Sequence, residues 1–164
     1  MSKVIKEPST FDDWLFCLDE YSKNGKNIDV VYNSLVKGSY NGNESMKIAL
    51  KEHIITSVNA FLQNATQKFT DGLNYAINFN DFSNIKKIFS NLKQDFLHLH
   101  FFNEYNFLDK EFIYELNDSL STQVNKFIND LKCYISEVLL YSKSSDLEDL
   151  LYVFNKIKLE GNYE

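Results

Sequence analysis

The stretch that decides the fold is residues 110–138, KEFIYELNDSLSTQVNKFINDLKCYISEV. Its apolar side chains recur at steps of three and four residues, at Ile113, Leu116, Leu120, Val124, Phe127, Leu131, Tyr134 and Val138. This spacing puts them on one face of an α-helix. Since neither glycine nor proline interrupts the stretch, we predict a long helix that begins after Asp109 and packs this face against other helices.

Five other segments have the same periodicity, and they predict helices over residues 11–22, 29–37, 46–76, 81–99 and 145–157. Thr10 with Asp13, and Ser145 with Glu148, have the spacing of capping boxes. In a capping box each of the two side chains accepts a hydrogen bond from the backbone amide of the other residue, at the start of a helix. Gly72 lies inside the longest segment and weakens it, so a bend or break is expected there. The seam of residues 82–99 indicates an antiparallel partner for residues 110–138.

No segment alternates with the two-residue period of a strand. The sequence therefore predicts an all-α, single-domain helical bundle of about six helices, three of them long, over residues 1–164. Residues 1–9 are expected to form a flexible tail. No apolar run reaches the ~20 residues of a membrane helix, and the N-terminus lacks the apolar core of a secretory signal. We expect a cytoplasmic protein that does not bind membranes.

The composition limits the range of functions. The chain has no arginine, and its 17 lysines face 23 acidic residues, for a formal net charge of -6. Arginine is the preferred side chain for bidentate contacts to phosphate and guanine. Its absence, together with the acidic balance, argues against nucleic-acid binding and against phosphate chemistry.

Motifs for catalysis or cofactor binding are missing as well. No glutamate has a histidine three residues later, as di-iron bundles require, and there is no Cys-x-x-Cys or glycine-rich phosphate loop. Cys17 and Cys133 lie in helical patterns and are expected to be reduced and buried. We predict no enzyme activity, no cofactor and no metal. The alternative is that the chain is a metal-dependent helical-bundle enzyme that uses Asp95, His98 and Glu104.

The candidate binding residues lie early in the long helix after Asp109. Glu111, Tyr114, Glu115 and Asp118 share one polar side of that helix, opposite the apolar seam. We call these four residues the acidic face. Acidic residues in a first turn also stabilise a helix through its dipole, which accounts for Glu111 better than for Asp118. The acidic face is thus either a solvated helix side or a surface for a basic partner.

Two further features bear on partner binding. The segment of residues 96–114 is rich in aromatic side chains, which either fill the core at a helix junction or contribute to a binding patch. A second negative cluster, of Asp12, Asp13, Asp19 and Glu20, lies near the N-terminus and is the alternative binding surface.

In size, acidity, lack of arginine and lack of catalytic motifs, the chain resembles the broad class of small acidic bacterial immunity proteins of contact-dependent inhibition, which neutralise toxins. The resemblance involves no residue motif and therefore assigns no functional residue. It implies a one-to-one complex in which acidic and aromatic side chains cover the basic active site of a toxin, most simply a nuclease. The oligomeric state is left open. Alternatives are a phage- or plasmid-encoded modulator of a host or defence protein and a self-associating structural bundle.

Overall fold

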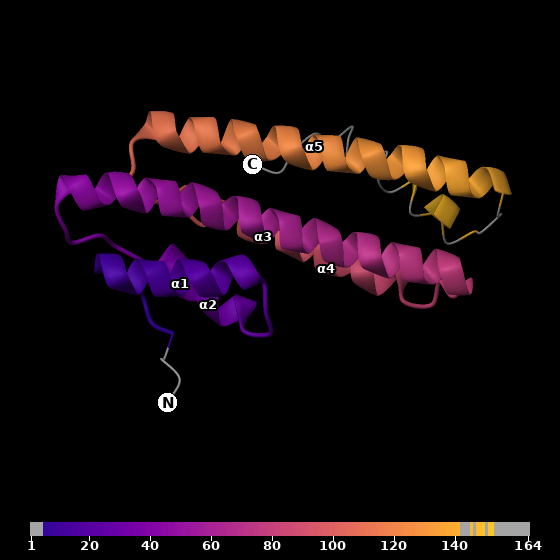
Figure 1. Cartoon of the computed structure of the whole chain (residues 1–164), viewed down its shortest axis with the longest axis horizontal. Helices are drawn as coiled ribbons and strands as arrows, with labels where there is room; N and C mark the ends of the chain where they lie inside the picture. The colour runs from indigo at the N-terminus through magenta and orange to yellow at the C-terminus, as the bar shows by residue number, and fades with distance from the viewer. Residues whose placement is uncertain (1–4, 142–144, 146, 150, 153–164) are drawn as a thin grey trace. The chain divides into compact units, whose positions relative to one another are not determined.

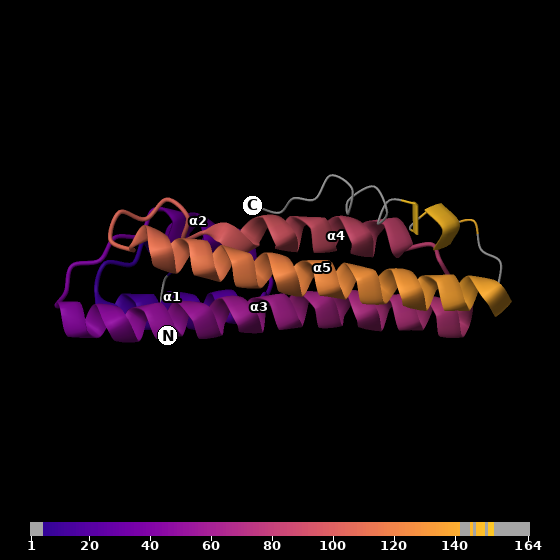
Figure 2. The same cartoon turned by 90° about the horizontal axis from the view of Figure 1, so that it is seen from above.

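The computed structural model describes residues 5–141, 145, 147–149 and 151–152. All regular secondary structure in these ranges is helical, which confirms the all-α fold class (Figures 1 and 2). The elements are α1 (Phe11–Lys23), α2 (Ile28–Val36), α3 (Glu44–Phe79), α4 (Ile85–Leu97), the short 3₁₀ helix η1 (His98–His100) and α5 (Lys110–Tyr141). The helix predicted over residues 145–157 lies partly outside the described residues. Where it is described it is helical, and Leu147 is buried.

The chain forms two compact units, and the long helices α3 and α5 each contribute to both. Unit 1 consists of the described residues within Met1–Ala65 and His98–Leu116. Unit 2 consists of those within Thr66–Leu97 and Asn117–Glu164. Each unit has its own buried core.

Unit 1 begins with the short antiparallel helices α1 and α2, which lie side by side (Figure 1). The predicted capping box starts α1: Asp13 N donates to Thr10 Oγ1 at 3.2 Å, and Thr10 N donates to Asp13 Oδ2 at 3.3 Å. Asn24 ends α1 with a left-handed φ of 48°. Asparagine tolerates this conformation better than most residues because its short side chain can hydrogen-bond locally.

The core of unit 1 is aromatic. Trp14, Tyr21 and Phe61 are fully buried, and the Tyr21 and Phe61 rings stack at 4.4 Å between centroids. The polar atoms of the buried rings find backbone partners: Trp14 Nε1 donates to Ser39 O at 2.7 Å, and Tyr21 Oη donates to His98 O at 2.7 Å. Buried donors need such partners, because an unpaired one costs about 1–3 kcal/mol.

Unit 2 contains the C-terminal part of α3, all of α4 and most of α5. In both views α4 runs antiparallel to α3 and to α5, as the sequence predicted for α4 and α5 (Figures 1 and 2). Phe69 of α3 is buried at the centre and contacts Phe89 of α4 and Phe127 of α5, each with ring centroids 6.5 Å away.

The apolar seam of α5 differs in part from the prediction. The structure buries Leu116, Leu120, Val124, Ile128, Leu131 and Ile135. Phe127 is half-buried and Tyr134 is exposed, so the prediction of these two as core positions was wrong by one residue in register. Tyr134 instead donates a hydrogen bond to Asn74 Oδ1 on α3, at 2.8 Å.

Two helix limits also differ from expectation. Helix α4 begins at Ile85 rather than at 81, because the Asp81 carboxylate accepts hydrogen bonds from Ser83 and holds a turn there. The predicted break at Gly72 is absent, and α3 continues through it. A Cβ atom on Gly72 would come within 3.0 Å of Ile88 Cδ1, so the glycine allows α4 to pack closely against α3.

Candidate functional site

All four residues of the acidic face are exposed on α5. Tyr114 is the most exposed aromatic residue among those described, with 72 % of its surface accessible. Glu111, Tyr114 and Glu115 lie in the first two turns of α5, and Asp118 lies one turn further along the same continuous helix. Opposite them on α5, Leu116 and Leu120 are buried. The local helix geometry thus presents three carboxylates and one phenol to solvent.

The carboxylates of the acidic face are free of local neutralisation. Across the described part of the chain, none of Glu111, Glu115 and Asp118 forms an ion pair. The nearby Lys51 of α3 is occupied: its Nζ lies 2.5 Å from Asp109 Oδ1 and 5.6 Å from the centre of the Phe112 ring. The hydrogen bond from Lys51 lowers the pKa of Asp109 below its ordinary value. Lys51 therefore pairs with Asp109, at the start of α5, and not with a residue of the acidic face.

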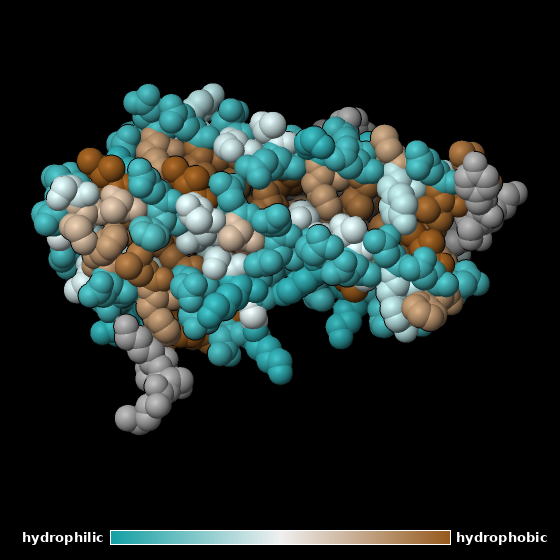
Figure 3. All heavy atoms as spheres, in the orientation of Figure 1, coloured by the Kyte–Doolittle hydropathy of each residue, from teal (hydrophilic) through white to brown (hydrophobic). Residues whose placement is uncertain are grey.

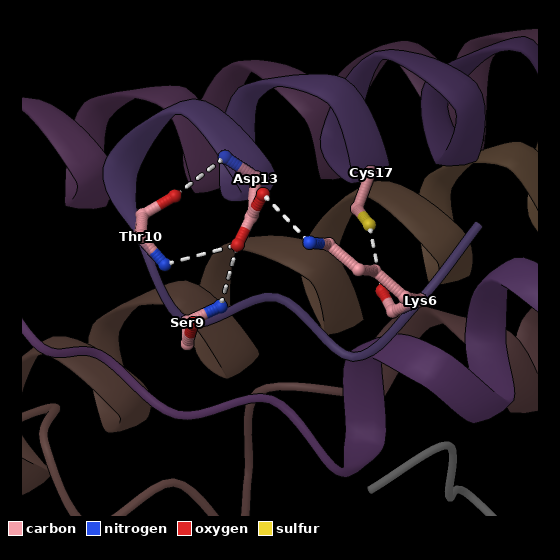
Figure 4. Close-up of polar contacts among 5 residues, drawn as sticks. All are labelled: Lys6, Ser9, Thr10, Asp13 and Cys17. Atoms are coloured by element: carbon pink, nitrogen blue, oxygen red, sulfur yellow. Dashed lines mark hydrogen bonds and ion pairs between the residues drawn. The ribbon is translucent and has the colours of Figure 1, made fainter. Parts of the chain in front are cut away.

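The N-terminal acidic cluster is arranged differently. Asp13 accepts hydrogen bonds from the backbone of Ser9 and Thr10 and lies 3.9 Å from Lys6 Nζ (Figure 4). These contacts, with the Thr10 amide as the largest contribution, lower the pKa of Asp13. Asp19 and Glu20 both face Lys23 Nζ, at 3.3 and 3.9 Å. Within this cluster, three of the four acids are already engaged by the chain itself.

The aromatic segment of residues 96–114 is mainly core. Phe96, Phe101, Phe102 and Tyr105 are buried, and Phe107 and Phe112 are half-buried. The Tyr105 phenol donates to the carbonyl of Leu35, and its burial raises its pKa well above the ordinary value. Tyr114 is the member of the segment that faces solvent. The structure therefore reduces the aromatic part of the candidate surface to this one side chain.

The histidines and cysteines have structural surroundings. His98 is 5 % exposed, its ring lies 4.4 Å from that of Tyr32, and its Nε2 lies 3.7 Å from Asp29 Oδ1. Asp29 is far from His98 in sequence, and no local spacing pointed to it. Among the residues that the structure describes, no three His, Cys, Asp or Glu side chains are grouped as a metal site. Cys17 is buried as expected, whereas Cys133 is exposed, because it follows the α5 seam by two residues.

The structure also contains a pocket that the sequence did not predict. It lies between α1 and the N-terminal half of α3 and has a volume of ≈ 310 Å³. Its lining residues are Leu15, Leu18, Asp19, Ser22, His53, Thr56, Ser57 and Ala60. Helical periodicity placed Leu15 and Leu18 in the stripe of one helix, but it cannot show which residue of another helix lies opposite. The small side chain of Ala60 leaves the space open.

The chain matches no known family model, and no curated protein or solved structure matches it significantly. None of the described helices is both long and apolar enough to cross a membrane.

Proposed function

We propose that this protein is a non-catalytic binding protein of the immunity type, which neutralises a basic toxin by covering its active site. The observation that carries the proposal is the acidic face: three carboxylates without an ion pair among the described residues, beside the exposed ring of Tyr114. Like charges four residues apart on a helix are mildly destabilising. Exposed carboxylates without a lysine partner can pair with cationic side chains of a basic molecule.

The contrast with the rest of the surface supports this choice of site. The chain carries 17 lysines, and several of them pair with acids one helical turn away, as Lys23 does with Asp19 and Lys126 does with Asp130 at 2.8 Å. The acidic face lacks such a lysine, although Lys110 is its immediate neighbour in sequence. Its carboxylates are therefore available to arginine and lysine side chains of a partner.

In such a complex the two kinds of side chain have different roles. Unpaired carboxylates attract a basic partner over a Debye length of about 8 Å at physiological ionic strength and accelerate association. Tyrosine adds a large, rigid contact area at low entropic cost and is enriched among residues that dominate binding energy. Tyr114 is thus expected to slow dissociation, whereas Glu111, Glu115 and Asp118 are expected to speed association.

An affinity pull-down from the source organism, with the full chain as bait, tests the proposal. The captured partner should have a basic surface and a catalytic activity that the chain inhibits at a one-to-one ratio. The substitutions Glu115→Lys and Asp118→Lys together should weaken inhibition without lowering the melting temperature, because both side chains are exposed. A partner that is acidic, or one whose activity is unaffected by the chain, would contradict the proposal.

A further inference from the structure

The pocket between α1 and α3 in unit 1 combines apolar walls with a carboxylate. Leu15, Leu18 and Ala60 supply apolar surface, and Asp19 adds a carboxylate whose side chain is 65 % exposed. No lysine is among the lining residues. In the space-filling view, apolar patches on this side of α1 and α3 are bordered by hydrophilic side chains (Figure 3).

Two specific contacts join α1 to α3 at residues that line the pocket, His53 and Ser22. The Phe11 ring meets the His53 ring edge-on, with centroids 5.9 Å apart. Asn64 Nδ2 donates to Ser22 O at 2.6 Å. Each contact joins a residue of α1 to one 42 positions later on α3. The two helices are therefore held in parallel register along the pocket, which makes it a preformed site.

The volume and the lining define what fits. The space of ≈ 310 Å³ is at the lower end of the range for pockets that hold drug-sized ligands, about 300–1,000 Å³, and it is large enough for one long side chain. A long cationic side chain can lay its methylene groups on apolar walls while its charged end stays at a wet edge. Asp19 and Thr56 both line the pocket and carry acceptor oxygens, and the Asp19 side chain is more than half exposed.

The existing partner of Asp19 is not an obstacle. Lys23 Nζ lies 3.3 Å from Asp19 Oδ2, and both side chains are more than half exposed. Exposed helix pairs of this kind contribute little stability, so an incoming cation can replace Lys23. Arginine suits the site better than lysine because its planar guanidinium offers several donors and is less strongly hydrated.

We propose that this pocket receives one arginine side chain of the basic partner, with the methylene groups against Leu15 and Ala60 and the guanidinium on Asp19. This inference rests on the proposed function, since it names the group by which the partner is anchored. It gives the partner a second point of contact besides the acidic face, and arginine is enriched among the residues that dominate binding energy.

The test uses the ¹⁵N-labelled full chain and the peptide acetyl-Gly-Gly-Arg-Gly-Gly-amide, followed by amide NMR shifts. Saturable shifts are expected in residues 15–22 and 53–60, with a dissociation constant on the order of millimolar, which is what one side chain can supply. The same peptide with citrulline in place of arginine has the same shape without the charge, and it should bind at least about threefold more weakly.

Variants sharpen the result. Asp19→Asn should weaken binding of the arginine peptide by about two- to fivefold, and Lys23→Gln should strengthen it because Asp19 is released. Ala60→Leu should fill the pocket and abolish the shifts, with its melting temperature as the check on folding. Asp12→Asn removes an exposed acid from the same helix outside the pocket, and it should leave the affinity unchanged.

The outcomes separate the two proposals. Equal binding of the citrulline peptide, shifts that do not saturate, or binding that survives both Asp19→Asn and Ala60→Leu would overturn the arginine pocket. Shifts confined to the first turns of α5 would also overturn it while supporting the acidic face. Glu115→Lys with Asp118→Lys should leave the peptide titration unchanged, because these residues do not line the pocket.

Discussion

Unit 1 buries tyrosine and tryptophan rings whose polar atoms reach distant backbone carbonyls, whereas the described core of unit 2 consists of aliphatic residues, alanine and phenylalanine. In unit 1 the Tyr21 hydrogen bond to His98 O spans 77 positions of sequence. In unit 2 the helices meet along regular seams with Phe69 at the centre. In the core of unit 1, aromatic side chains are held by hydrogen bonds to backbone carbonyls. In the core of unit 2, apolar side chains pack along the faces of the helices.

This difference bears on where the exposed candidate binding groups lie in the molecule. Hydrogen bonds from Trp14 and Tyr21 fix the segments around Ser39 and His98. Unit 1 can therefore hold irregular segments rigidly, and it carries the pocket and the start of the acidic face.

The largest effect is expected at the centre of unit 2. Phe69→Ala should destabilise the protein by about 3–5 kcal/mol, because a buried phenylalanine leaves a cavity that its neighbours cannot fill. Phe127→Ala is the matched comparison on the facing helix and should cost less, since Phe127 is only half-buried. Urea unfolding gives both values. Equal costs would show that depth of burial does not govern this core.

A smaller effect is expected in unit 1 when one hydrogen bond is removed without changing volume. Tyr105→Phe removes the phenol that donates to Leu35 O and should cost about 1 kcal/mol. The cost stays moderate because the same carbonyl also accepts from Gly38 N at 2.9 Å. Tyr114→Phe makes the same chemical change at an exposed site and should leave the melting temperature unaltered. If the two variants melted alike, directional bonds would not distinguish unit 1.

The smallest effect concerns the α1 cap and depends on pH. Because folding lowers the pKa of Asp13 from its ordinary 3.8, its ionised form contributes stability above that pH. The contribution is lost as pH falls through the lower, folded-state pKa. Asp13→Asn should therefore lower the melting temperature at pH 7 and converge with the wild type at the acidic end of a series below pH 4. A difference that persisted unchanged at low pH would exclude the carboxylate as its source.

Periodicity predicted the helices well, because apolar residues at steps of three and four over a long stretch indicate an α-helix. It predicted α1, α3 and the all-α class, and it placed Leu116, Leu120 and Val124 correctly in the seam of α5. It failed at Phe127 and Tyr134, where a long seam drifts around the helix and the neighbouring residue becomes the buried one.

The candidate site could be predicted only as a pattern on one helix. Exposure of Glu111, Tyr114, Glu115 and Asp118 follows from their position opposite the seam. The ion pairs of Lys51 with Asp109 and of Lys23 with Asp19 depend on which side chains come close together in the folded chain. The pocket beside Asp19 likewise requires the register of α1 against α3, which no local spacing encodes.

The most direct test of the central claim is the association rate of the partner as a function of salt, measured by stopped-flow fluorescence. Glu115→Lys with Asp118→Lys should slow association at least about tenfold at low salt and flatten its salt dependence, since steering by the acidic face is lost. Glu7→Lys with Glu137→Lys changes the net charge equally at exposed acids outside the acidic face, and it should slow association much less. Equal slowing by the two double variants, or an unchanged rate for both, would contradict the acidic face as the partner-binding surface.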